Sequence, residues 1–128
     1  STNVVAIAGL NASLKGLDID EHRKTIRELT EYLLEALNGI PSVNLMGIFD
    51  TDKTLGIVSF VVEGYQSDEV GTILDDEYDI AVRTGYHCAP YIHDYLGDKP
   101  YHGTIRIGIG QFNTKEDIDA LISAIKSL

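Results

Sequence analysis

The run from Leu55 to Val62 constrains the fold more than any other stretch of this chain. It is nearly all apolar and rich in β-branched residues, which is typical of a strand covered on both faces. Such a strand needs other strands beside it and helices packed on it. The sequence therefore predicts an α/β fold, and the remaining segments have to supply both kinds of element.

Several helices are predicted from apolar residues that recur at helical spacing. They cover Val4 to Leu14, about Asp20 to Asn38 (capped by Asp18 or Asp20 and ended by Gly39), Ser67 to about Glu77, Ala89-Pro90 to about Leu96, and a C-terminal stretch behind a capping box of Thr114 with Asp117. Ser67 is the expected cap of its own helix. The first helix would lack a full partner on a small sheet, which indicates that something larger packs against it.

The other strands are expected at Val43 to Met46, Ile80 to Arg83 and Thr104 to Ile109. In the last of these, alternation places Arg106 on the face opposite Ile105 and Ile107. We therefore expect residues 1–128 to form a single domain of the α/β class. Its sheet would be small, mixed or antiparallel, with three to four strands packed with helices.

Composition and charge exclude several classes of partner for this chain. With 128 residues, 44% of them hydrophobic, the chain is long enough for one well-buried core. Its net charge of -10 argues against nucleic acid or anionic membranes as partners, and no apolar run reaches the roughly 18 residues of a membrane span. A single cysteine and no visible signal peptide predict a cytoplasmic protein. The missing initial Met predicts a piece of a longer one.

Cys88 is the first candidate for chemistry. A free cysteine is most often a small buried hydrophobe. Here it follows a strand and a glycine loop and precedes a predicted helix start, where backbone N–H groups and the helix dipole would stabilise a thiolate. His87 and His93 lie nearby and could exchange a proton with it. At this point a packing role and a reactive thiol both stay open.

Arginines form the second group of candidates. Arg106 lies in an otherwise apolar, glycine-containing strand, where a guanidinium fork suits bidentate binding of a carboxylate, although an arginine on a strand by default points to solvent. Arg83 has the same two interpretations, and we favour a structural one, as a holder of the cysteine loop.

A zinc site is a weaker alternative. His87, Cys88, His93 and His102 are the residue types that bind zinc, but their spacing matches no closed tetrahedral pattern.

Three motifs together resemble a known family. Arg-Thr-Gly-Tyr-His-Cys-Ala-Pro at 83–90, Gly-Thr-Ile-Arg-Ile-Gly at 103–108 and Phe-Asn-Thr-Lys-Glu-Asp-Ile-Asp at 112–119 resemble the C-terminal part of cysteine desulfurases. These belong to the class V aminotransferase group of fold-type-I pyridoxal-phosphate enzymes. The resemblance covers nearly the whole chain, so it implies that residues 1–128 are the C-terminal small domain of such an enzyme, without the large domain.

The resemblance also implies roles. The full-length enzyme would use pyridoxal 5'-phosphate to take sulfur from L-cysteine as a persulfide on Cys88, releasing L-alanine. Arg106 matches the arginine that binds the substrate's α-carboxylate, and Arg83 and His87 match supporting positions in the cysteine loop. The full-length enzyme would be a homodimer, and the short interval between Cys88 and Arg106 resembles the branch that often passes sulfur to an acceptor protein.

One departure limits these implications. The family's Schiff-base lysine follows a characteristic loop of the large domain, and Lys15, Lys24 and Lys53 have none of that context. The isolated chain is therefore expected to be inactive. The alternatives are a selenocysteine lyase or another class V aminotransferase, and a non-catalytic interaction, sulfur-carrier or zinc-binding module.

Overall fold

The computed structural model describes residues 1–47 and 50–128. In chain order the elements are α1 (Val4–Lys15), α2 (Ile19–Asn38), β1 (Val43–Met46), β2 (Ile57–Val62), α3 (Ser67–Tyr78), β3 (Arg83–Gly85), α4 (Ile92–Leu96), the 3-10 helix η1 (Lys99–Tyr101), β4 (Thr104–Gly108) and α5 (Lys115–Lys126). The α/β class predicted from the sequence is confirmed.

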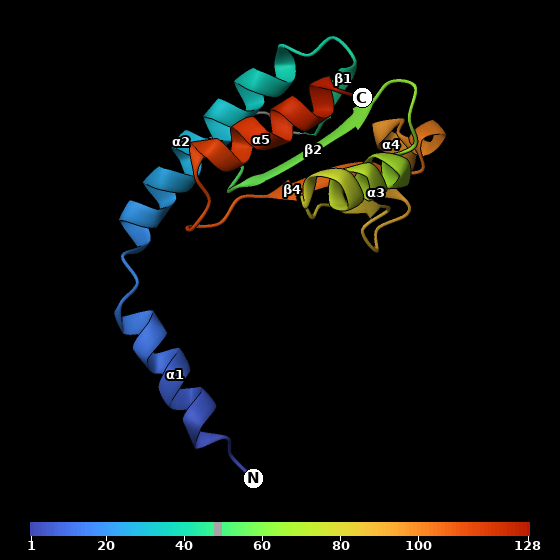
Figure 1. Cartoon of the computed structure of the whole chain (residues 1–128). Coiled ribbons are helices and arrows are strands. Elements are labelled where there is room, and N and C mark those ends of the chain that lie inside the picture. The colour runs from blue at the N-terminus through green and yellow to red at the C-terminus, as the bar shows by residue number, and fades with distance from the viewer. Residues whose placement is uncertain (48–49) are drawn as a thin grey trace.

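The sheet has four strands within the described residues, in the order β1-β2-β4-β3. Each neighbouring pair is antiparallel, which settles the choice between a mixed and an antiparallel sheet. Helices α2, α3 and α5 pack against one face of this sheet, where their buried residues join those of β2 and β4 in a single core (Figure 1). Most of the opposite face near the start of β2 stays uncovered.

The core is apolar and tightly enclosed. Phe60 on β2 and Ile105 on β4 are fully buried beneath Leu33, Leu74 and Ile125 of the three helices. Burying side chains of this size stabilises a fold by about 1.5–3 kcal/mol each, before the entropy of ordering them is subtracted. This packing fixes the sheet on which the candidate site lies.

Helix starts follow local hydrogen bonding. The capping box of Thr114 and Asp117 is confirmed, and the Asp117 pKa is lowered because its carboxylate accepts the Thr114 backbone N–H and an Asn113 amide hydrogen. The prediction that Ser67 caps α3 is wrong. Gln66 occupies the N-cap, and the buried Ser67 hydroxyl instead donates to the Gly103 carbonyl at 2.8 Å. This bond ties α3 to the start of β4.

Three predicted boundaries need correction. The strand expected at Ile80 to Arg83 is β3, Arg83–Gly85, because the Ile80 N–H still closes α3 by bonding to Leu74. The helix expected from Ala89-Pro90 begins only at Ile92. The strand expected from Leu55 to Val62 begins at Ile57, which is 56% exposed, so this run is not covered on both faces along its whole length.

Helix α1 buries none of its residues and extends away from the body of the fold (Figure 1). Asn3 caps its start by accepting the Ala6 N–H, and its apolar side chains stay exposed. The expectation that the first helix lacks a partner on this sheet therefore agrees with the structure. None of the helices in residues 1–47 and 50–128 is both long and apolar enough to cross a membrane.

Candidate functional site

A row of polar side chains crosses the uncovered face of the sheet. Arg106 of β4 lies opposite Ser59 of β2 on one side and opposite Arg83 of β3 on the other. Alternation along β4 points Ile105 into the core and Arg106 to the other face, as the sequence predicted. Two guanidinium groups therefore stand side by side on one face, which is a favourable arrangement for an anion.

The candidate thiol follows β3 directly, in a tight turn. The Ala89 N–H donates to the Tyr86 carbonyl at 2.9 Å, and the two residues between them, His87 and Cys88, have φ of 51° and 63°. Positive φ at both central residues is the pattern of a type I′ turn, which normally selects glycine or asparagine. Non-glycine residues there cost about 1–2 kcal/mol each. Strain of this kind gathers at functional sites.

The environment of Cys88 differs from the predicted one. Cys88 is exposed, which rules out the role of buried core filler. Because α4 begins at Ile92, the helix does not start directly after Cys88 as the sequence predicted. A cation takes that place instead, since Arg83 Nη2 lies 3.7 Å from Cys88 Sγ. Arg83 thus contacts the sulfur itself, a closer relation than the loop-holding role favoured from the sequence.

His87 links the turn to β4. Its Nε2 lies 2.9 Å from the Thr104 hydroxyl, and its Nδ1 is buried without a hydrogen-bond partner among the described residues. Burial lowers the His87 pKa, and the positive charge of Arg106 lowers it further, because both disfavour the charged ring. The ring is therefore neutral near pH 7 and able to accept a proton.

His93 is not a free neighbour of the thiol, as the sequence had allowed. It is 2% exposed, and both ring nitrogens are engaged, Nδ1 with Asp98 at 2.6 Å and Nε2 with the Tyr86 carbonyl at 2.9 Å. Sequence reasoning missed Asp98 altogether. The available sequence signal was Gly97, because glycine is common where a helix ends. In the structure Gly97 has a φ of 72° and ends α4, and the next residue, Asp98, contacts His93.

The zinc alternative gains no support from this geometry. His93 has no nitrogen left for a metal, and His102 lies 3.5 Å from the Gln66 side chain. Within residues 1–47 and 50–128, no three His, Cys, Asp or Glu side chains gather closely enough to hold a metal ion.

Comparison with known proteins decides the family. The family model for class V aminotransferases matches residues 1–121. The chain belongs to the class V aminotransferase family. Sequence relatives agree with this assignment: the chain is 35% identical to a probable cysteine desulfurase of Halalkalibacterium halodurans and 30% identical to a cysteine desulfurase of Wigglesworthia glossinidia brevipalpis. Each match covers 98% of this chain and 30% of the relative, so the chain spans less than a third of their length.

Solved structures of the same family share the fold. A cysteine desulfurase of Escherichia coli superposes with a TM-score of 0.78 at 29% identity, covering 99% of this chain and 31% of that one. The apo cysteine desulfurase of Thermococcus onnurineus NA1 gives a TM-score of 0.74 at 30% identity, over 84% of this chain and 26% of that one. The resemblance identified from the three motifs is therefore confirmed at the level of the family.

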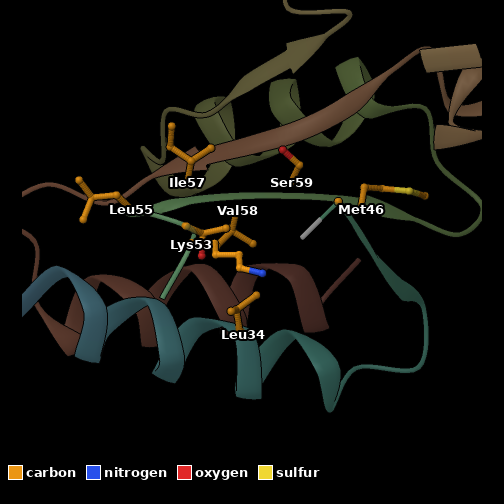
Figure 2. A pocket seen from close by; sticks show the side chains of 9 residues that line it. Leu34, Met46, Lys53, Leu55, Ile57, Val58 and Ser59 are labelled. Atoms are coloured by element: carbon orange, nitrogen blue, oxygen red, sulfur yellow. The ribbon is translucent and has the colours of Figure 1, made fainter. Parts of the chain in front are cut away.

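A separate cavity of about 350 Å³ lies between α2 and the β1–β2 edge of this class V aminotransferase chain. Figure 2 shows Ile57 and Ser59 pointing to one side of β2 and Val58 to the other, toward Leu34. Its other lining residues are Met46, Gly47, Lys53, Thr54 and Leu55. It shares only Ser59 with the row on the open face and contains neither the thiol nor an arginine, so we place the candidate site at the Cys88 turn.

Proposed function

We propose that this chain is the C-terminal small domain of a pyridoxal-phosphate-dependent cysteine desulfurase, and that Cys88 is the thiol that receives sulfur. One observation carries the proposal: an exposed thiol in a strained turn lies 3.7 Å from Arg83, whose strand partner Arg106 stands on the same open face. The names of the sequence relatives support the choice of reaction.

Arg106 supplies substrate binding in this proposal. Its guanidinium donates two parallel hydrogen bonds to a carboxylate, and the opposing Arg83 adds positive charge to the same side of the sheet. An α-carboxylate held there orients the rest of a cysteine substrate relative to the turn that carries Cys88. No acidic side chain forms an ion pair with either arginine among residues 1–47 and 50–128. Both therefore remain available for an anion.

Cys88 supplies the nucleophile, and the Arg83 guanidinium lies beside its sulfur. A bond forms between the Cys88 sulfur and the substrate sulfur, and the substrate's carbon–sulfur bond breaks. Sulfur is oxidised to the persulfide level and the carbon is reduced, so thiol and L-cysteine become persulfide and L-alanine with all atoms balanced.

The residues of this chain do not fit the cofactor itself. Lys99 is paired with Asp94, Lys53 with Asp50, and Lys115 lies over the Tyr32 ring. The other lysines are on helices α1, α2 and α5, away from the open face of β2–β4. Pyridoxal phosphate, when bound by the rest of the protein, supplies the electron sink for cleaving the carbon–sulfur bond. The isolated chain is accordingly proposed to be inactive.

The exposure of Cys88 also bears on how sulfur would leave the enzyme. A persulfide on Cys88 would be open to an acceptor protein, and Tyr91 and Tyr95, which follow it in the chain, are 87% and 96% exposed. We propose that the full-length enzyme acts as a homodimer and hands sulfur to such an acceptor.

The full-length protein tests the proposal. It is incubated with pyridoxal phosphate and L-cysteine, and alanine, sulfide and protein persulfide are measured for the wild type, Cys88→Ala and the control Ser123→Ala, at an exposed position of α5. We expect the Cys88 variant to bind the cofactor, as judged by its absorbance, but to form no persulfide, while Ser123→Ala keeps the persulfide. Equal persulfide formation by Cys88→Ala would overturn the assignment of Cys88, and no alanine from the wild type would overturn the reaction.

A further inference from the structure

The buried pair of His93 and Asp98 lies directly behind the Cys88 turn. The two side chains are 2% and 0% exposed, and His93 Nδ1 lies 2.6 Å from Asp98 Oδ2. On its other side, His93 Nε2 lies 2.9 Å from the Tyr86 carbonyl. Burying two polar side chains costs free energy that an apolar pair would not cost, even when their hydrogen bonds are made. We therefore look for a role of this pair beyond packing.

The hydrogen-bond chemistry fixes one proton. A carbonyl oxygen only accepts, so His93 Nε2 must carry a hydrogen and donate it to Tyr86. His93 Nδ1 and the Asp98 carboxyl then share one further proton between them. Asp98 keeps the ring in this orientation, as a carboxylate does for a metal-bound or catalytic histidine.

The Tyr86 carbonyl is also the anchor of the strained turn. It accepts the Ala89 N–H at 2.9 Å, and the two residues enclosed by that bond are His87 and Cys88, both with positive φ. The turn thus has one backbone hydrogen bond of its own to offset the cost of two left-handed non-glycine residues. The bond from His93 supplies a second, partly buried contact to the same oxygen.

Asp98 connects this anchor to the strand that carries Arg106. Its backbone carbonyl accepts the N–H groups of Tyr101 at 3.0 Å and of Gly103 at 3.2 Å, and Gly103 directly precedes β4. The pair therefore joins the cysteine turn on one side to the start of the arginine strand on the other.

We propose that His93, oriented by Asp98, is a positioning residue that holds Cys88 in its left-handed turn beside Arg83. His93 does not touch the sulfur; it acts through the Tyr86 carbonyl. The inference rests on the proposed function for its catalytic meaning, because only a sulfur-accepting Cys88 gives the placement a use. The placement itself can be measured without any enzyme activity.

Two variants that differ by one methylene form the test. In His93→Gln the side-chain amide reaches the place of Nε2 and keeps a donor for the Tyr86 carbonyl. In His93→Asn the amide reaches only the place of Nδ1, next to Asp98, and that donor is lost. Both are compared with the wild type in the 128-residue chain, where Cys88 is the single cysteine.

Two readouts report on the turn. We expect the Ala89 amide of His93→Asn to exchange with deuterium about tenfold faster than in the wild type, the effect of losing one hydrogen bond. The rate constant for alkylation of Cys88 by iodoacetamide should change about threefold or more, since the bond that placed the sulfur beside Arg83 is gone. His93→Gln should stay within about twofold on both readouts. The amides of β2 and β4 serve as the control for global stability.

Equal behaviour of the two variants would overturn the proposal and leave His93 a structural residue. A wild-type measurement keeps the test decisive if either variant fails to fold: nitrogen-15 NMR must find a hydrogen on His93 Nε2, and a bare Nε2 would overturn the proposal. The Cys88→Ala assay of the full-length enzyme is independent of these results. Failure of the desulfurase reaction and failure of the positioning role are therefore distinguishable.

Discussion

Arg83 and Arg106 lie directly opposite each other in the β3–β4 ladder, on the face of the sheet that the helices leave open. Like charges in this position destabilise a strand pair, and the chain carries 20 acidic residues against 10 basic ones without placing any of the acids in an ion pair with these two within the described residues. We interpret the pair as positive charge kept free for an anionic substrate.

Removing one of these charges should stabilise the isolated chain. Arg106→Gln is expected to raise the free energy of unfolding by about 0.5 kcal/mol, the usual size of a cross-strand charge effect. Urea unfolding measures this change. Lys24→Gln on α2 controls for the altered net charge, and an Arg106→Gln chain no more stable than that control would contradict the interpretation.

Substitutions of the two arginines should change different kinetic constants of the full-length enzyme. Arg106→Lys loses the planar fork that binds a carboxylate, and hydrogen bonds to charged groups contribute about 1.5–3 kcal/mol. We expect KM for L-cysteine to rise about tenfold or more with a smaller change in kcat. Arg83→Lys, which changes the side chain 3.7 Å from the Cys88 sulfur, should lower kcat more than it raises KM. The opposite pattern would exchange the two roles.

Much of this fold could be predicted from the sequence, because its signals are local. The Thr114 capping box, the stripe of α2 and the alternation around Arg106 depend on residues close together in the chain. Ser67 was predicted wrongly because its hydroxyl bonds to Gly103, a contact that only tertiary structure supplies. The same applies to Ile80 to Val82. They were predicted to be in a strand, but the Ile80 N–H bonds to Leu74 at the end of α3 and the strand begins only at Arg83.

The candidate site shows the same division. Cys88 and Arg106 could be proposed as site residues from the sequence, but the contact between Arg83 and the thiol could not. That contact depends on where β3 begins to pair with β4, three residues later than the apolar pattern suggests. Asp98 was missed because a buried carboxylate has no sequence signal of its own, and its partner His93 had several possible roles until its burial was known.

Acid should destabilise the chain through His87. Its pKa is lowered from 6.5 in the folded state, so the unfolded state binds the proton more readily and stability falls as pH drops below 6.5 through the folded-state pKa. Thermal unfolding between about pH 7.5 and pH 5 should show a larger loss in the wild type than in His87→Gln. His102→Gln, at an exposed position, is the control, and identical slopes for wild type and His87→Gln would count against a half-buried, neutral His87.

Gly103 should be intolerant of any side chain. Its φ is +95°, and an added Cβ would lie 2.3 Å from the Gly85 carbonyl oxygen in the neighbouring strand β3. Gly103→Ala is therefore expected to destabilise the chain by about 2 kcal/mol or more, through left-handed strain and a backbone clash that nothing flexible can relieve. Gly108→Ala, at the end of the strand β4 that Gly103 precedes, has open space around it and should cost far less. Comparable urea midpoints for the two variants would show that β3 and β4 approach less closely than described.

Leucines on α1 and α2 should differ sharply in their contribution to stability. Leu33 is fully buried under the sheet, and Leu33→Ala is expected to cost about 2–5 kcal/mol because it leaves a cavity in a core that cannot close around it. Leu10 is 61% exposed on a helix that buries nothing, so Leu10→Ala should stay within about 0.5 kcal/mol in the isolated chain. Urea unfolding of both variants measures the difference.

In the full-length enzyme the result for Leu10 should change, because an apolar helix face gains stability only from a partner that covers it. A Leu10→Ala cost that stays near zero there would contradict the expectation that something larger packs against α1 in the full-length enzyme.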